Sequence, residues 1–289
     1  MTEKTPEKIT IHTLAEKKSR GEKITSITAY DYPSARLVDR AGVDVALVGD
    51  SVSMVVAGRP NTLEATLEEM LYHTRSARRG IERALLVADM PFGSYHVSET
   101  VAVRNALRLV KEAGAEAVKL EGGRKQAPLV ERLVQSEIPV MGHIGLTPQS
   151  LHMFGGYRVQ GKTAEAGRAL LDDALALTAA GAFAIVLEGI PREIAAAITR
   201  QVPVPTIGIG AGPDCDGQVL VFHDLLGLSF GVQPKFVRRY AELGVEIGQA
   251  LTRFGADVGS GAFPSDEESY HLPASEKEKL LPARPRAPR

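Results

Sequence analysis

Short apolar segments recur along the chain, and each is followed by a segment with helical spacing. The apolar segments are rich in Val, Ile and Leu and lie at 24–29, 43–48, 85–88, 117–120, 140–144, 184–187 and 206–209. A strand that is buried on both faces, as in a parallel sheet, has this composition. The intervening segments 67–79, 99–113 and 164–180 instead repeat their apolar residues at spacings of three and four, which predicts amphipathic helices.

Glycines close these predicted helices shortly before the next strand. Gly42, Gly114 and Gly181 each follow a helical segment, where glycine can adopt the left-handed conformation that ends a helix. Strict alternation of strand and helix predicts a parallel sheet with right-handed crossovers. The fold class is therefore α/β. An eighth strand is expected at 218–222 or 227–230, and eight strands would form a closed (β/α)₈ or TIM barrel. The alternative is a doubly wound open sheet, which would carry a glycine-rich fingerprint after its first strand; residues 29–34 read Ala-Tyr-Asp-Tyr-Pro-Ser.

The chain of 289 residues is expected to form one catalytic domain and a tail. Barrels of this class commonly reach about 250 residues as a single domain. We assign residues 1–263 to the barrel, including an N-terminal extension. Residues 264–289 are polar and end in a segment rich in Pro and Arg, so they are expected to form a flexible tail.

Composition narrows the function classes. The net charge of −1 gives no reason to expect nucleic acid or an anionic membrane as a partner. No apolar run approaches the roughly 20 residues of a membrane span, and the N-terminus lacks the apolar stretch of a secretory signal. The single cysteine, Cys215, excludes an internal disulfide framework and fits a reducing compartment. These features predict a cytoplasmic protein.

Ionisable residues follow the predicted strands, at the end of a barrel where active sites are built. Asp50, Asp89 and Glu121 would place three negative charges at one mouth, and their repulsion would be relieved by a cation. Asp50 and Asp89 are the best candidate metal ligands, with Glu121 as a third. Carboxylate oxygens without cysteine favour a hard ion such as Mg²⁺. The alternative is that Asp50 or Asp89 caps the following helix.

Three further residues at these strand ends suggest roles around a substrate. Lys119 and Glu121 alternate on one strand and therefore point to the same face. Lys119 could bind a substrate carboxylate, stabilise an enolate or form a Schiff base. Neighbouring acids should keep its amine protonated, which favours the first two roles. The alternative is that Lys119 only forms a structural ion pair with Glu121. Glu188 follows an apolar strand, a setting that raises a carboxyl pKa towards that of a general base, although an ordinary loop acid would look the same. His143 could orient substrate by a hydrogen bond or be a core histidine.

Taken together, seven motifs in the same order resemble those of the ketopantoate hydroxymethyltransferase family. They are ITAYD at 27–31, LVGDS at 47–51, ADMPF at 88–92, VKLEGG at 118–123, GHIGLTPQS at 142–150, FGGY at 154–157 and IGIGAG at 207–212. The resemblance extends over about residues 10 to 265. It implies a Mg²⁺-dependent barrel of the phosphoenolpyruvate/pyruvate type. The implied reaction transfers a hydroxymethyl group from 5,10-methylenetetrahydrofolate to 3-methyl-2-oxobutanoate, giving 2-dehydropantoate on the route to pantothenate and coenzyme A.

The resemblance also implies roles for individual residues. The metal ligands would be Asp50, Asp89 and Glu121, the substrate contacts Asp50, Ser51, Asp89 and Lys119, and the proton acceptor Glu188. The reaction would pass through a metal-stabilised enolate, and the chain would assemble into a large homo-oligomer, typically a decamer. The main alternative is a metal-dependent lyase or aldolase that acts on another 2-oxo acid. A Schiff-base aldolase that uses Lys119 and a non-catalytic oligomeric scaffold are further alternatives.

Overall fold

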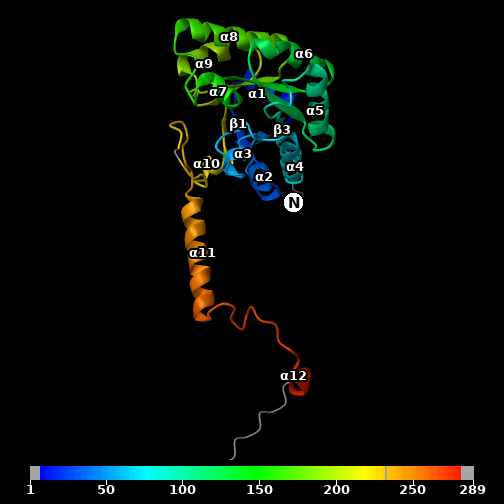
Figure 1. The fold of residues 1–289 in the computed structure, drawn as a ribbon, viewed down its shortest axis with the longest axis vertical. Coiled ribbons are helices and arrows are strands. Elements are labelled where there is room, and N and C mark those ends of the chain that lie inside the picture. Colours follow the sequence, from blue (N-terminus) through cyan, green and yellow to red (C-terminus); the bar gives the residue numbers. More distant parts are fainter. Residues whose placement is uncertain (1–6, 232, 281–289) are drawn as a thin grey trace, which may run out of the picture. The chain divides into compact units, whose positions relative to one another are not determined.

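Eight parallel strands close into a barrel in the computed structural model, which describes residues 7–231 and 233–280 (Figure 1). The strands are β1 (Ile24–Thr28), β2 (Val45–Val48), β3 (Leu85–Asp89), β4 (Ala117–Glu121), β5 (Val140–Gly145), β6 (Ala184–Glu188), β7 (Thr206–Ile209) and β8 (Gly217–Leu220). Because β1 pairs with both β2 and β8, the sheet has no free edge. The predicted TIM barrel is confirmed and the open sheet is wrong. The eighth strand is the first of the two expected segments, and 227–230 is not a strand.

Helices connect successive strands and surround the barrel. They are α2 (Tyr32–Arg40), α3 (Val52–Val55), α4 (Leu67–Arg78), α5 (Glu99–Lys111), α6 (Ala127–Gln135), α7 (Leu151–Phe154), α8 (Ala164–Ala179), α9 (Arg192–Gln201) and α10 (Phe222–Leu225), with short 3₁₀ turns η1 (Arg124–Gln126) and η2 (Pro148–Ser150). The glycines expected to close helices do so. Gly42, Gly114 and Gly181 have φ of 75°, 78° and 94°, a region that favours glycine.

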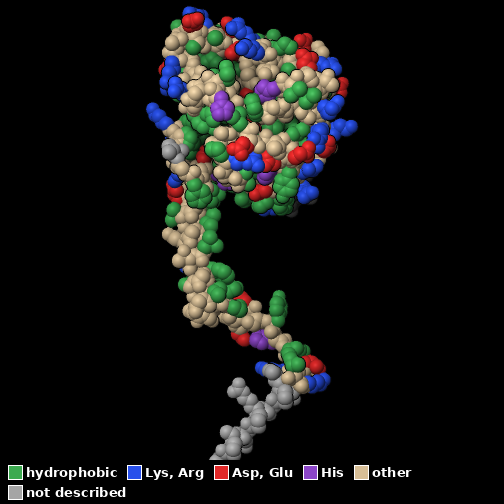
Figure 2. All heavy atoms as spheres, viewed as in Figure 1, with side chains coloured by type: hydrophobic (Ala, Val, Ile, Leu, Met, Phe, Trp, Pro, Cys, Tyr) green, Lys and Arg blue, Asp and Glu red, His purple; other side chains and the backbone are tan. Residues whose placement is uncertain are grey.

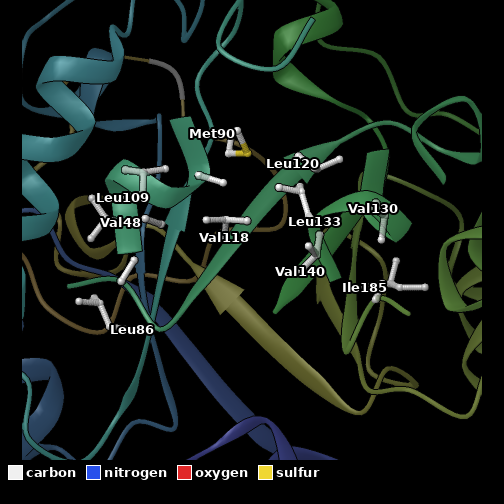
Figure 3. Close-up of a cluster of buried hydrophobic side chains, with 14 of the residues drawn as sticks. Val48, Leu86, Met90, Leu109, Val118, Leu120, Val130, Leu133, Val140 and Ile185 are labelled. Atoms are coloured by element: carbon white, nitrogen blue, oxygen red, sulfur yellow. The ribbon is translucent and has the colours of Figure 1, made fainter. Parts of the chain in front are cut away.

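Alternation along each strand divides the buried apolar residues into two clusters. One fills the interior of the barrel and includes Val45, Leu85, Val87, Met141 and Val186. The other lies between the sheet and the helices, and Figure 3 shows part of it, with side chains that include Leu86, Leu109, Val118, Leu133 and Ile185. Neighbouring strand residues therefore face opposite sides, so the residue that follows an inward apolar side chain by two positions also points inward.

The N-terminal extension closes the barrel at the end opposite the predicted site. Helix α1 (Ile11–Ser19) begins at a capping box formed by Thr10 and Thr13. Leu14 is fully buried and packs with the interior cluster. Lys17 pairs with Asp44 at 2.7 Å, which fixes the helix beside the start of β2.

The chain divides into two compact units, Met1–Ala241 and Glu242–Arg289. The division therefore comes before residue 263, where the sequence led us to end the barrel domain, and the flexibility of residues 264–289 stays a prediction. The second unit contains α11 (Leu243–Ser260) and α12 (Ala274–Leu280), and residues 281–289 lie outside the described part of the chain.

The surface of the described residues mixes charges of both signs. Figure 2 shows Lys and Arg side chains interspersed with Asp and Glu on the visible face of the barrel unit, in keeping with the net charge of −1. Among the described residues, no helix is both long and apolar enough to cross a membrane.

Candidate active site

The predicted site residues gather at the carboxyl ends of five adjacent strands. Asp50, Asp89, Lys119, Glu121 and His143 are each at most 5% exposed, although all of them carry ionisable groups. The strand register explains the neighbours, because Asp89 lies beside Lys119 and Glu121 lies beside His143. These side chains point into the barrel at its carboxyl-terminal end, next to the apolar cluster that fills the interior.

The two aspartates are linked to each other rather than to the helices that follow them. The backbone N–H of Asp50 donates to Oδ2 of Asp89 at 3.0 Å. Burial, followed by the charges of Asp89 and Glu121, raises the pKa of Asp50 well above its usual range. Burial also raises the pKa of Asp89, although Lys119 opposes this shift. The first turn of α3 has no side-chain cap, so the capping role considered for Asp50 is not observed.

Lys119 lies among the acids as expected, but its close partner differs from the one considered. Its Nζ is 2.9 Å from Oδ1 of Asp89, whereas the sequence suggested Glu121 as the structural partner. Register decides this, since Asp89 is the cross-strand neighbour of Lys119. Burial alone would lower the pKa of Lys119, but the charges of Asp89, Glu121 and Asp50 outweigh it and raise that pKa. The neighbouring acids thus favour the protonated amine, which disfavours a Schiff base.

His143 joins Glu121 and Glu188. Its Nδ1 is 3.5 Å from Oε1 of Glu121, and its Nε2 is 3.2 Å from Oε2 of Glu188. Burial and the charge of Lys119 would lower the pKa of His143, but hydrogen bonds with the two glutamates outweigh them and raise it to about 9. Glu188 does not stand in the purely apolar setting that the sequence suggested, because an imidazole faces it. At 15% exposure its side chain is also the most accessible carboxylate of the group.

Two neighbouring residues were not predicted as parts of the site. The hydroxyl of Tyr30 is 2.8 Å from Oγ of Ser51, so a buried phenol fixes the predicted substrate contact. Gln149 lies among the carboxylates and is almost fully buried. Both residues occur in motifs that carry the family resemblance, and this was the sequence feature that could have identified them as parts of the site. Asp31, in contrast, follows β1 but caps α2 by accepting the N–H of Ser34.

A cavity of about 970 Å³ opens above these side chains. Its polar part is lined by the predicted site residues Asp50, Ser51, Asp89, Lys119, Glu121, His143 and Glu188. The remainder is mainly apolar and is lined by residues that include Met54, Val159, Ile190, Leu220 and Phe236. The cavity thus has both charged and apolar walls, and Arg192, Asp224 and Lys235 line it as well.

Comparison with known proteins assigns the chain to a family. The sequence model described as ketopantoate hydroxymethyltransferase matches residues 8–266. The chain belongs to the ketopantoate hydroxymethyltransferase family. As a member of that family it is a transferase. It is 59% identical to the 3-methyl-2-oxobutanoate hydroxymethyltransferase of Koribacter versatilis, over 92% of this chain and 90% of the relative. It is 56% identical to the enzyme of the same name from Pelobacter propionicus, over 91% and 98% of the two chains.

Solved structures of lower sequence identity share the fold of this family member. A phosphonopyruvate hydrolase, solved in complex with oxalate and Mg²⁺, matches with a TM-score of 0.57 at 14% identity, over 93% of this chain and 94% of that chain. A 2,3-dimethylmalate lyase of the PEP mutase/isocitrate lyase superfamily matches with a TM-score of 0.55 at 16% identity, over 93% and 97%. At these identities the likeness supports the barrel fold alone.

Proposed function

We propose that the chain transfers a hydroxymethyl group from 5,10-methylenetetrahydrofolate to 3-methyl-2-oxobutanoate, giving 2-dehydropantoate for pantothenate synthesis. The observation that carries the proposal is the buried cluster of ionisable side chains that lines the cavity. In it the amine of Lys119 lies 2.9 Å from Asp89, and the more accessible Glu188 lines the same cavity. Membership of the ketopantoate hydroxymethyltransferase family supports the choice of reaction.

The donor set fits a hard divalent cation. Asp50, Asp89 and Glu121 offer only oxygen, and burial with mutual repulsion raises the pKa of the two aspartates, so a nearby positive charge would relieve them. Among residues 7–231 and 233–280, no three His, Cys, Asp or Glu side chains already stand as a complete ligand set. Mg²⁺ does not require one, because it usually binds one or two carboxylates and keeps waters or substrate oxygens. Asp50, Asp89 and Glu121 would hold it directly or through water, and it would polarise the 2-oxo group of the substrate.

The protein's own groups then divide the remaining work. The ammonium of Lys119 stabilises the negative charge that develops on the 2-oxo oxygen when an enolate forms. Glu188 accepts the proton from C3, since it is the accessible carboxylate at the edge of the cluster. Nε2 of His143 lies 3.2 Å from Oε2 of Glu188, so the imidazole limits where that carboxylate can lie. Ser51 contributes a hydroxyl to the lining of the cavity. The cavity, at about 970 Å³, leaves room for a second, larger substrate.

Proton exchange tests this assignment most directly. Metal-stripped protein is incubated with 3-methyl-2-oxobutanoate in deuterated water, with and without Mg²⁺, and the C3 hydrogen is followed by NMR. We expect Mg²⁺-dependent exchange in the parent protein and none in Glu188→Gln, which should still bind the oxo acid. Exchange that persists in Glu188→Gln would remove Glu188 from the role. If no exchange occurs even with folate present, the assigned substrate is wrong, and turnover without folate would favour a lyase or aldolase on another 2-oxo acid.

We also propose that the chain works in the cytoplasm as a homo-oligomer, for which a decamer is the prediction. Support comes from α11, where apolar side chains repeat at helical spacing and are not covered within their own unit, among them Ile247, Leu251, Phe254 and Val258. A stripe of this kind is usually covered by a partner. Light scattering of the parent and of a Leu251→Glu/Phe254→Glu variant tests this, with a lower mass expected for the variant. A monomeric parent would contradict it.

A further inference from the structure

Gln149 lies in η2 and makes contacts to two of the predicted metal ligands. Its side-chain Nε2 donates to Oδ2 of Asp50 at 2.8 Å, and its backbone N–H donates to Oε2 of Glu121 at 2.9 Å. The same Nε2 donates to the carbonyl of Met90 at 3.1 Å. One residue from the loop after β5 therefore joins carboxylates that come from β2 and β4.

The chemistry of its neighbours fixes which way the amide of Gln149 points. The carboxylate of Asp50 and the carbonyl of Met90 can only accept, so the NH₂ group must face them. The amide oxygen accepts from the hydroxyl of Tyr95 at 2.6 Å. Both the NH₂ group and the oxygen of the amide thus have hydrogen-bond partners. In the reverse orientation the amide oxygen would face the carboxylate of Asp50 and the carbonyl of Met90, which are acceptors and could not pair with it.

Tyr95 extends the same network to the backbone of Glu121. The N–H of Glu121 donates to the Tyr95 hydroxyl at 3.3 Å, and that hydroxyl in turn donates to Gln149. Tyr95 and Gln149 are both buried, so water does not readily replace either group. The carboxylates of Asp50 and Glu121 each have one oxygen held by this network, which limits rotation of both groups.

We propose that Gln149 and Tyr95 are positioning residues that set the orientation of Asp50 and Glu121 for a divalent cation. The inference rests on the proposed metal-dependent function and adds residues that act through the ligands. A neutral amide suits this place, because it donates to the carboxylate of Asp50 and to the carbonyl of Met90 without adding charge to the cluster. Groups that orient metal ligands by hydrogen bonds typically change metal affinity by about 10- to 100-fold when they are removed.

Two substitutions separate the parts of the network. Gln149→Met keeps a similar length and leaves the backbone N–H bond to Glu121, but it removes both donors from Asp50 and Met90. Tyr95→Phe keeps the buried ring and removes only the hydroxyl. Gln149→Asn retains an amide but withdraws it by one methylene. Gln135→Met is the matched control, because Gln135 lies on the exposed side of α6 and bonds only to Glu131 among the described contacts.

The test is the affinity of each metal-stripped protein for Mn²⁺ alone, measured by the EPR signal of the free ion. Circular dichroism confirms that each sample is folded. We expect the Mn²⁺ Kd to rise about 10- to 100-fold in Gln149→Met, several-fold in Tyr95→Phe and Gln149→Asn, and to stay within about twofold in Gln135→Met. A purely structural role would lower thermal stability and leave the Kd of the folded protein unchanged.

The outcomes distinguish this inference from the proposed function. If the parent binds Mn²⁺ and the folded variants bind it within about twofold of the parent, the positioning role is wrong while the metal site stands. If Gln149→Met does not fold, Tyr95→Phe and Gln149→Asn decide the question by the same measurement. If the parent itself binds no Mn²⁺, the metal-dependent function and the positioning role are both overturned.

Discussion

Replacing Lys119 by Met should destabilise the protein strongly, because it leaves buried acids without their partner. Nζ of Lys119 lies 2.9 Å from Asp89, and both side chains are almost fully buried. At an effective dielectric constant of about 20, a pair at this separation attracts by roughly 6 kcal/mol. Part of that gain is offset by the desolvation of the ammonium, which the variant no longer needs. We therefore expect the free energy of unfolding to fall by about 3–5 kcal/mol at pH 7.

The loss should also depend on pH with a definite sign. Burial already raises the pKa of Asp89 above its usual value, and removing Lys119 takes away the group that opposes this shift. The folded variant then binds more protons than the unfolded chain between the two pKa values of Asp89. Its stability should therefore rise relative to the parent as the pH falls from 7 to 5, since protonation of the carboxyl removes the unpaired charge.

Urea unfolding of metal-stripped protein at pH 7 and pH 5 measures both effects. Lys162→Met, at an exposed lysine, is the control for loss of a lysine and should stay within about 0.5 kcal/mol of the parent. Adding Asp89→Asn to Lys119→Met should recover part of the loss, because neither charge then remains. A Lys119→Met protein that unfolds within about 1 kcal/mol of the parent at both pH values would refute the reasoning about the buried pair.

Three further predictions concern acid, metal and loop geometry. A hydrogen bond from Arg59 helps to lower the pKa of Glu69 to about 2, so ionised Glu69 stabilises the fold above its unfolded pKa, and this contribution is lost as the pH falls towards 2. In urea unfolding, Glu69→Gln should therefore lower the free energy of unfolding by about 1 kcal/mol or less at pH 7. An equal difference between variant and parent at pH 2 would contradict this. Mg²⁺ at 100 times its Kd should stabilise the protein by about 2.7 kcal/mol, so a melting temperature unchanged by chelator would contradict the metal site. Gly145→Ala would place a methyl group against the carbonyl oxygen of Glu188, at a φ of 97°, and should reduce turnover at least tenfold; unchanged turnover would contradict this.

Much of the fold was predictable because its signals are local. Apolar strand segments and the glycines that end helices, such as Gly42 and Gly181, depend on neighbouring residues alone. The eighth strand was ambiguous because both candidate segments are short and neither has a long apolar run. The division after Ala241 has no signal of its own in the sequence, because α11 has the same helical spacing as the helices that cover the barrel, and the domain boundary at residue 263 stays a prediction. Spacing indicates an amphipathic helix but does not identify what covers its apolar face.

The membership of the site was predictable, but its pairing was not. An ionisable residue at a strand end points to the barrel mouth whatever its neighbours are, so Asp89, Lys119 and Glu188 could be assigned from position. Which acid pairs with Lys119 depends on strand register, and the partner of Glu188 depends on the reach of His143 from β5 to the neighbouring strand β6. Gln149 has no charge and follows no strand directly. Its role depends on a loop folding back over the mouth, which sequence spacing does not reveal.

The alternation that builds the core also explains why the site is buried and costly. On β3, β5 and β6 an inward apolar residue is followed two positions later by an inward ionisable one: Val87 by Asp89, Met141 by His143, and Val186 by Glu188. The charged groups thus lie directly on the apolar interior, where water is scarce and charges interact strongly. Burial raises the pKa of the aspartates, and the neighbouring carboxylates raise the pKa of Lys119 although burial opposes that shift. Burial makes the cluster unfavourable without a cation. It also strengthens the interaction of the cluster with negative charge that develops on a bound 2-oxo acid, because little solvent competes for that charge.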